Sequence, residues 1–201
     1  PIIPGDLARS AEEAAAVADQ VGYPVVMKIV SPDILHKSDS GGILLNLSDK
    51  SAVMNGYRQI TARVSAAMPD AQIEGVLVEA MAPKGHEVIL GMRRDPQFGP
   101  LMMFGFGGIY VELFADVAFR IAPLSAGDAE AMIQETKAGR LLQGLRGAPP
   151  ADRKALIDVM MRLSQIAIDF PELEEMEINP LLVMQNGVLA LDARAIARPK
   201  S

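Results

Sequence analysis

The chain has 201 residues, of which half are hydrophobic, and its net charge is -6. This length is sufficient to bury a hydrophobic core, and we expect one domain built of two lobes. The net negative charge argues against a surface that binds nucleic acid, because phosphate backbones are bound by broad positive patches. The absence of cysteine excludes disulfides, zinc–thiolate sites and cysteine nucleophiles, and it fits a reducing cytoplasm.

No stretch of the sequence predicts a membrane span. The longest apolar run, residues 101–111, is about half as long as a bilayer requires and contains three glycines, so we interpret it as a buried strand and turn. The chain begins with Pro1 and shows neither the basic segment nor the apolar core of a signal peptide. Because a native chain would begin with Met, we expect a cleaved precursor or one domain of a longer polypeptide.

The first half of the sequence alternates helical and strand patterns. Ser10 and Glu13 form a capping box that opens an Ala-rich helix, and we expect this helix to end at Gly22. The apolar, β-branched run 25–30 predicts a buried strand. A polar loop, a strand, a helix and a further strand are expected to follow, in that order, over residues 31–42, 43–47, 49–68 and 75–81.

In the second half, short strands are expected before two helices and a closing hairpin. The strands are predicted over 87–92, 100–104 and 117–121, and the helices over a segment from Ser125 and over 151–170. The last two strands, 177–184 and 188–193, are joined through Gln185, Asn186 and Gly187, and Asn-Gly is the preferred two-residue hairpin turn. The aromatic content of 4% and the 12 methionines favour α/β packing over a small β-barrel.

Lys28 interrupts the apolar run 25–30, where an ammonium group is costly unless it meets an anion or extends to solvent. Two interpretations are open at this point: an edge-strand lysine that reaches water, or a lysine that binds a phosphate. The pair Gly41 and Gly42 would let backbone N–H groups approach phosphate oxygens, although a lone Gly-Gly pair is a weak signal.

The closing hairpin carries oxygen ligands on both arms. Asn179 and Asp192 are 13 residues apart and lie on the two predicted strands. A tight turn would bring the arms side by side, so that a hard cation such as Mg2+ could bind both residues. Carboxylates on surface hairpins are also common, and spacing alone does not choose between a metal site and a solvated surface.

Six ordered segments of the sequence share a pattern with one family. They are PVVMK from Pro24, SPDILHKSD from Ser31 with Gly41 and Gly42, DPQFGP from Asp95, FGFGGIYVE from Phe104, LLQGLRG from Leu141, and EINPL from Glu177 followed by Leu191-Asp-Ala-Arg. The shared pattern covers nearly the whole chain, from Gly22 to Arg194. In this pattern the chain resembles the ATP-grasp domain of ADP-forming acetyl-CoA and acyl-CoA synthetases, which are relatives of succinyl-CoA synthetase.

The resemblance implies an α+β (α/β) ATP-grasp fold in which two lobes clamp ATP or ADP together with Mg2+. The N-terminal lobe is expected over residues 1–82, and the C-terminal lobe with the metal-binding hairpin over residues 83–201. Asn179 and Asp192 resemble the Mg2+ ligands of the family, and Glu177 is a nearby candidate.

The resemblance also implies roles toward the nucleotide. Lys28 resembles the lysine that contacts the phosphates, with Gly41 and Gly42 beside them. The segment Glu79, Ala80, Met81 and Ala82 resembles the hinge that hydrogen-bonds adenine. Glu87 resembles a second acidic residue of the nucleotide pocket, on the ribose side.

A lone loop histidine such as His36 is ordinarily a solvated side chain. In the acetyl-CoA synthetase branch, however, the loop with this motif carries a histidine that moves a phosphoryl group between two distant sites, and His36 matches it. Imidazole suits this chemistry, because it is nucleophilic when neutral and its phosphorylated nitrogen remains a good leaving group. We assign His86 no role.

Four arginines could offer planar forks to phosphates, because guanidinium groups suit bidentate phosphate binding. They are Arg93, Arg94, Arg120 and Arg146. We interpret Arg93 and Arg94 as the solvated end of a hairpin, and we leave the roles of the other two open.

The implied overall reaction is acyl-CoA + ADP + Pi ⇌ carboxylic acid + CoA + ATP, through acyl phosphate and phosphohistidine. The sequence offers no CoA-binding and acyl-binding portion, so we expect that portion as a partner domain or subunit, with the full enzyme an oligomer. One alternative is a regulatory nucleotide-sensing domain fused to another enzyme such as an acetyltransferase, against which the intact Lys28, Asn179 and Asp192 argue. Another is an ATP-grasp ligase that passes acyl phosphate to an amine, against which the His36 loop argues.

Overall fold

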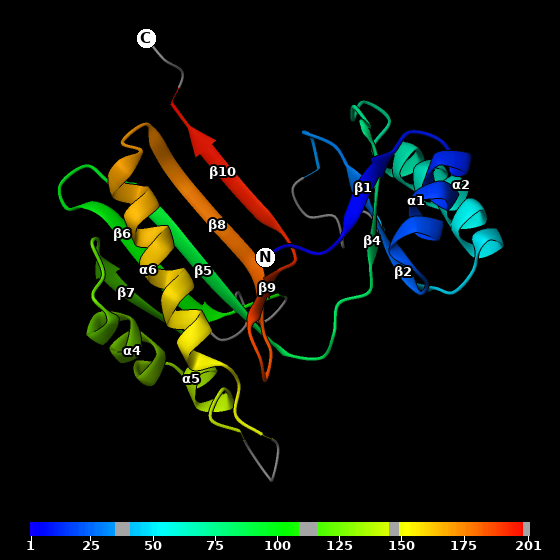
Figure 1. The fold of residues 1–201 in the computed structure, drawn as a ribbon. Helices are drawn as coiled ribbons and strands as arrows, with labels where there is room; N and C mark the ends of the chain where they lie inside the picture. The colour runs from blue at the N-terminus through cyan, green and yellow to red at the C-terminus, as the bar shows by residue number, and fades with distance from the viewer. Residues whose placement is uncertain (35–40, 109–115, 145–148, 199–201) are drawn as a thin grey trace. The chain divides into compact units, whose positions relative to one another are not determined.

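The computed structural model describes residues 1–34, 41–108, 116–144 and 149–198. The chain divides into two compact units, Ile3–Ala82 and Pro83–Ser201, and residues 1 and 2 belong with the second (Figure 1). Within the described residues, no helix is both long and apolar enough to cross a membrane.

The first unit is a four-stranded antiparallel sheet with two helices on one face (Figure 1). The core on that face contains Met27, Ile29, Val76 and Val78 together with helical residues. Because side chains alternate across a strand, Lys28 and Glu79 lie on the opposite face. The strand order is β1-β4-β2-β3, and the elements are β1 (Gly5–Ala8), α1 (Ala11–Val21), β2 (Val25–Val30), β3 (Ile43–Leu47), α2 (Lys50–Ala67) and β4 (Gly75–Ala80).

The second unit is a six-stranded antiparallel sheet in the order β10-β8-β5-β6-β7, with β9 paired to β8. Its core lies between the sheet and the helices and includes Leu90, Met102, Phe104, Leu156 and Met160. The strands are β5 (His86–Asp95), β6 (Gly99–Phe106), β7 (Val117–Ile121), β8 (Leu173–Val183), β9 (Val188–Ala190) and β10 (Ala193–Ala197), and the helices are α4 (Ala126–Glu135), α5 (Lys137–Leu141) and α6 (Arg153–Asp169).

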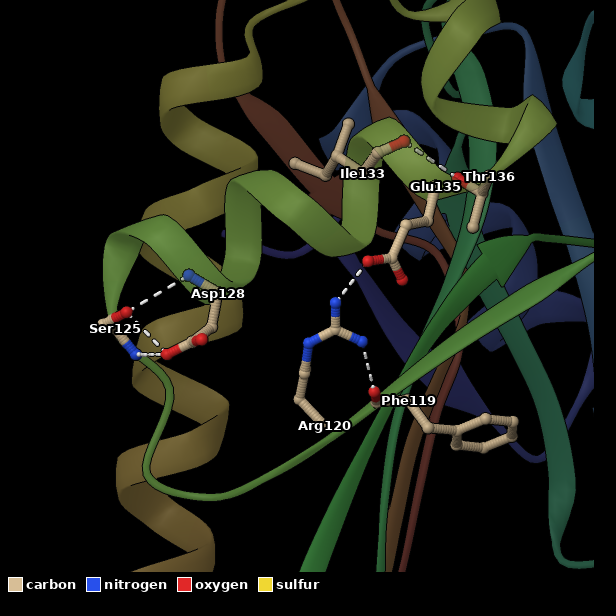
Figure 2. Close-up of polar contacts among 7 residues, drawn as sticks. All are labelled: Phe119, Arg120, Ser125, Asp128, Ile133, Glu135 and Thr136. Carbon is tan, nitrogen blue, oxygen red and sulfur yellow. Dashed lines mark hydrogen bonds and ion pairs between the residues drawn. The ribbon is translucent and has the colours of Figure 1, made fainter.

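Polar contacts fix both ends of α4 (Figure 2). Ser125 Oγ accepts a hydrogen bond from Asp128 N at 3.1 Å, and Asp128 Oδ2 accepts one from Ser125 N at 2.9 Å, so the helix that we expect from Ser125 begins in a capping box. Arg120 of β7 pairs with Glu135 of α4 and donates to the Phe119 carbonyl at 2.7 Å. Arg120 therefore joins the edge strand to this helix.

Arg94 is not the solvated side chain that we expect from the sequence. Its guanidinium donates to the carbonyl oxygens of Ala167 at 2.7 Å and Phe170 at 3.3 Å, and to that of Leu173 at 3.2 Å. These oxygens belong to the end of α6 and the start of β8, where helical carbonyls lack intrahelical partners. Arg94 therefore caps α6, whereas Arg93 is exposed as predicted.

Two short elements and a strand boundary differ from those predicted from the sequence. β1 and α5 are absent from the predicted elements, and β6 extends two residues beyond the predicted strand, to Phe106. Helical and strand patterns alternate in the first half as expected, and the strand pairs of both sheets in the described residues are antiparallel.

Candidate functional site

Lys28 and Glu79 form an ion pair on the face of the first sheet that the helices leave uncovered. Lys28 Nζ lies 2.8 Å from Glu79 Oε2, and the two side chains are only 14% and 10% exposed. They are diagonal neighbours, because Lys28 pairs with Leu77 and Glu79 with Val26 in the β2–β4 ladder. Lys28 is therefore not the fully hydrated edge-strand lysine that one interpretation allows.

Glu79 keeps hydrogen-bonding capacity despite this ion pair. Its Oε2 is buried, and within the described part of the chain no donor reaches it with hydrogen-bond geometry. The 2.8 Å contact with Lys28 is thus close but poorly aligned. Buried polar atoms of this kind call for a partner, because an unmade hydrogen bond costs free energy, and a ligand amino group would supply one.

Gly5 of β1 makes the room for the Glu79 side chain. Gly5 pairs with Glu79, and a Cβ atom at position 5 would lie 2.6 Å from Glu79 Cγ and 2.5 Å from the Val78 carbonyl oxygen. A side chain there would displace Glu79 or separate β1 from β4. This residue cannot be identified from the sequence, because the strand that contains it is too short to show a pattern.

The predicted hinge segment has fewer free backbone donors than the resemblance suggests. Ala80 N donates to the Pro4 carbonyl at 3.0 Å, and Met81 N donates to the Pro24 carbonyl at 3.2 Å. Ala82 N–H is the donor of this segment that no described backbone oxygen engages. Ala80 and Met81 therefore support the segment, and Ala82 offers its amide.

Gly41 and Gly42 immediately precede β3, and they differ in their surroundings. Gly41 has a φ of +67°, and a Cβ there would lie 2.5 Å from Arg63 Cδ of α2. Gly42 is buried, and its carbonyl accepts from Ile29 N at 2.8 Å, next to Lys28. The two glycines thus lie beside β2, the strand that contains Lys28. The exposed Arg63 is a nearby cation that no motif in the sequence indicates.

The closing hairpin places Asn179 and Asp192 opposite each other. Ile178 pairs with Ala193, and Asn179 N donates to the Asp192 carbonyl at 3.0 Å. The predicted proximity of these two residues follows from one continuous register along the hairpin. The turn is closed by Met184 N donating to Gly187 O at 3.1 Å, so its central residues are Gln185 and Asn186, one position earlier than the preferred Asn-Gly pair.

Asp152, the N-cap of α6, holds this turn. Its Oδ2 accepts from Gly187 N at 2.8 Å, and its Oδ1 accepts from Ala155 N at 3.0 Å in the first turn of the helix. Its own N–H donates to the Met184 carbonyl at 2.8 Å. One side chain therefore supports both the helix and the hairpin.

Glu87 and Asn179 meet at the glycine pair that follows β6. Gly107 N donates to the Glu87 carbonyl at 3.0 Å, and Gly108 N donates to Asn179 Oδ1 at 2.8 Å. A Cβ atom on Gly108 would lie 2.4 Å from Glu87 Oε2. We name Glu87, Gly108, Asn179 and Asp192 the hairpin cluster.

The hairpin cluster fits magnesium held together with phosphate. Among the residues that the structure describes, no group of three or more His, Cys, Asp or Glu side chains could hold a metal ion. Asn179 and Asp192 offer one amide and one carboxylate oxygen, and Mg2+ is ordinarily bound by one or two protein oxygens together with substrate phosphates and water. The donors therefore suit a metal–nucleotide complex better than a cation bound by protein alone.

Several predicted residues fall elsewhere. His36 and Arg146 lie outside the described residues. Glu177 lies on β8 opposite Arg194, two residues before Asn179. His86 lines a cavity of about 280 Å3 with Glu87, Val88, Phe106 and the α5 residues Ala138 and Leu141.

Comparison with known proteins gives the family. A family model described as an ATP-grasp domain matches residues 1–196. The chain belongs to the ATP-grasp family. The resemblance that the six sequence segments carry is thereby confirmed, and with it the ATP-grasp fold of mixed helix and sheet.

Two relatives of this ATP-grasp domain are ligases. The chain is 47% identical over 195 residues to the acetate–CoA ligase (ADP-forming) I of Archaeoglobus fulgidus, and it is 46% identical over 190 residues to the beta subunit of the acetate–CoA ligase (ADP-forming) I of Pyrococcus furiosus. The matches cover 97% and 94% of this chain. The chain spans 28% of the Archaeoglobus ligase and 82% of the Pyrococcus subunit.

A solved structure is also similar to this ATP-grasp domain. Dinucleotide-forming acetyl-coenzyme A synthetase 1 of Ca. Korarchaeum cryptofilum, in complex with coenzyme A, Ca-AMPCP and HgCl+, aligns with a TM-score of 0.94 and 48% identity over 98% of this chain and 86% of that one. A second structure of that synthetase, with coenzyme A and Mg-AMPPCP, has its phosphohistidine segment pointing towards the nucleotide binding site. It aligns with a TM-score of 0.84 and 44% identity, over 98% of this chain and 85% of that one.

Proposed function

We propose that this chain is the nucleotide-binding and phosphoryl-transfer part of an ADP-forming acyl-CoA synthetase, which converts acid, CoA and ATP into acyl-CoA, ADP and Pi. The observation that carries the proposal is the secluded ion pair of Lys28 and Glu79, in which a buried carboxylate oxygen lacks an aligned donor among the described residues. The ligase identity of the relatives supports this reaction over a regulatory nucleotide sensor.

In this proposal each residue near the ion pair has one task. Lys28 neutralises charge on the nucleotide phosphates, since an ammonium group is a compact cation for phosphate oxygens. Ala82 N–H and the unaligned Glu79 oxygen bind the edge of the adenine ring, which carries one acceptor next to one amino group. Gly5 leaves Glu79 the space to do so.

Asn179 and Asp192 hold Mg2+ in the proposed function. When bound, the cation neutralises phosphate charge that develops during transfer. Glu87 accepts hydrogen bonds from the ribose hydroxyls, and its carboxylate is exposed and accessible to them.

His36 is proposed as the phosphoryl carrier. A neutral ring nitrogen attacks the γ-phosphorus, the bond to the ADP oxygen breaks, and ADP leaves. The substrate carboxylate then takes the phosphoryl group from the ring to give an acyl phosphate, and the CoA thiolate displaces Pi. The last two steps require a CoA-binding and acyl-binding partner portion, which we propose as a fused domain or a second subunit.

We expect Lys28→Ala to weaken ADP binding by roughly 10- to 100-fold, because one charge-assisted contact is worth roughly 1.5–3 kcal/mol. Isothermal titration calorimetry of the chain with Mg2+ and ADP measures this effect. Since the substitution also leaves Glu79 without its cation, the titration is done well below the melting temperature of the variant.

Lys50→Ala is the matched control. Lys50 pairs with Asp19 at 3.4 Å, but the two side chains are 64% and 48% exposed, so its loss removes a hydrated ion pair of the same unit. The control should bind ADP like the unsubstituted chain. If the folded, unsubstituted chain binds no ADP at millimolar concentration, the proposed function is wrong.

A further inference from the structure

Asn179 lies at an irregularity of the second sheet. Val88 of β5 pairs with Leu181 and Leu90 pairs with Ile178, so Asn179 and Pro180 together oppose the single residue Ile89. Such a bulge re-aims a side chain and leaves the extra residue outside the regular ladder. The β5 ladder therefore does not fix the orientation of the Asn179 side chain.

Gly108 makes a hydrogen bond to the Asn179 side chain, which the β5–β8 ladder leaves unconstrained. Its N–H donates to Asn179 Oδ1 at 2.8 Å, from a segment 71 residues earlier in the chain. The position of this N–H is set by Gly107, whose own N–H donates to the Glu87 carbonyl at 3.0 Å. Gly107 is packed so closely on β5 that a Cβ there would lie 2.6 Å from the Val88 carbonyl carbon and oxygen.

Gly108 itself requires the absence of a side chain for two reasons. Its φ is +61°, a left-handed conformation that L-residues adopt at a cost. A Cβ there would also lie 2.4 Å from Glu87 Oε2, so Glu87 would have to move. Because that oxygen is the end of a flexible side chain, the clash is relieved without unfolding the sheet.

We propose that Gly108 is a positioning residue for the metal-binding side chain of Asn179, an inference that rests on the proposed function. The Gly108 N–H occupies one lone pair of Asn179 Oδ1 and leaves the second for the cation. Hydrogen bonds of this kind, made to a metal ligand rather than to the metal, orient the ligand, and their loss ordinarily lowers metal affinity by about 10- to 100-fold.

The test compares Gly108→Ala with Gly99→Ala by calorimetry of ADP binding at graded Mg2+ concentrations. Gly99 begins β6, the strand that precedes Gly108. It has a φ of +77°, and a Cβ there would meet no atom within 4 Å, so its substitution adds similar backbone strain away from the hairpin cluster. We expect Gly108→Ala to raise about tenfold the Mg2+ concentration at which the cation's strengthening of ADP binding is half-maximal. Metal-free ADP affinity should fall only by what the displaced Glu87 contributes to ribose binding. Gly99→Ala should leave both unchanged.

Asn179→Ala separates this inference from the proposed function. If Asn179→Ala raises the Mg2+ concentration required, while Gly108→Ala raises it no more than Gly99→Ala does, the positioning role is wrong and the metal site stands. If Asn179→Ala also has no effect, the assignment of the metal ligand is wrong.

A measurement on the unsubstituted chain covers the case in which Gly108→Ala does not fold. The amide proton resonance of Gly108 should shift when Mg2+ is added to the ADP-saturated protein, because its acceptor Asn179 then binds the cation. The amide of Gly99 should not shift. An unchanged Gly108 resonance at saturating Mg2+ would overturn the proposal.

Discussion

Replacing His36 by Ala should lower turnover of the reconstituted synthetase about a thousandfold or more, because the ring nitrogen is the proposed covalent acceptor of the phosphoryl group. Acid-labile, base-stable label from γ-phosphate-labelled ATP should disappear from the chain. ADP affinity, measured by calorimetry, should stay within about twofold, since the proposed carrier need not contact the nucleotide at rest.

The second histidine of the chain is the control for this experiment. His86 begins β5 and lines the cavity beside α5, and it has no proposed part in phosphoryl transfer. His86→Ala should retain both label and turnover. Turnover at the unsubstituted rate in the His36→Ala assembly would show that the phosphoryl group passes directly to the partner portion.

Gly139→Ala should destabilise the second unit by about 3 kcal/mol or more. A Cβ atom at this position of α5 would lie 1.7 Å from the Ile133 carbonyl oxygen and 2.6 Å from its carbon. Thr136 holds these groups together, because its Oγ1 accepts from Gly139 N at 3.1 Å and donates to Ile133 O at 3.1 Å. Relief of the clash therefore requires α4 and α5 to separate.

Urea unfolding followed by circular dichroism measures this loss, and Gly127→Ala is its matched control. Gly127 lies in α4, and a Cβ there would meet only Ser125 Oγ at 3.6 Å, which is an ordinary contact. The control should be neutral or stabilising by up to about 1 kcal/mol, since Ala favours helix over Gly. A Gly139→Ala protein within about 1 kcal/mol of the unsubstituted chain would contradict the packing described for α5.

Features with a local cause were predictable from the sequence. Ser10 and Ser125 begin α1 and α4 because their side chains cap the following turn, and both patterns lie within four residues. The hairpin register that brings Asn179 opposite Asp192 also depends on a short closing turn. Loop closure over so few residues costs little, which makes such pairings readable from the sequence.

Features that depend on distant residues were not predictable. Glu79 is the counter-ion of Lys28 from another strand, and Arg94 is a helix cap because α6 ends beside β5. The bulge at Asn179 and the hydrogen bond from Gly108 N to Asn179 Oδ1 arise from β5, β8 and the segment after β6 together. A glycine pair in the sequence indicates conformational freedom of the backbone, but only the folded sheet shows which side chain accepts its hydrogen bond.

The double role of Asp152 gives the hairpin a sensitivity to acid. Hydrogen bonds from the backbone N–H groups of Ala155 and Gly187 hold the pKa of Asp152 below its ordinary value. Because the folded-state pKa is the lower one, the stability that this carboxylate contributes is complete above about pH 4 and is lost as the pH falls through the folded-state pKa. Protonation weakens the hold on the hairpin turn and on the first turn of α6 together, so acid would loosen the arms that carry Asn179 and Asp192 from a point remote from both residues.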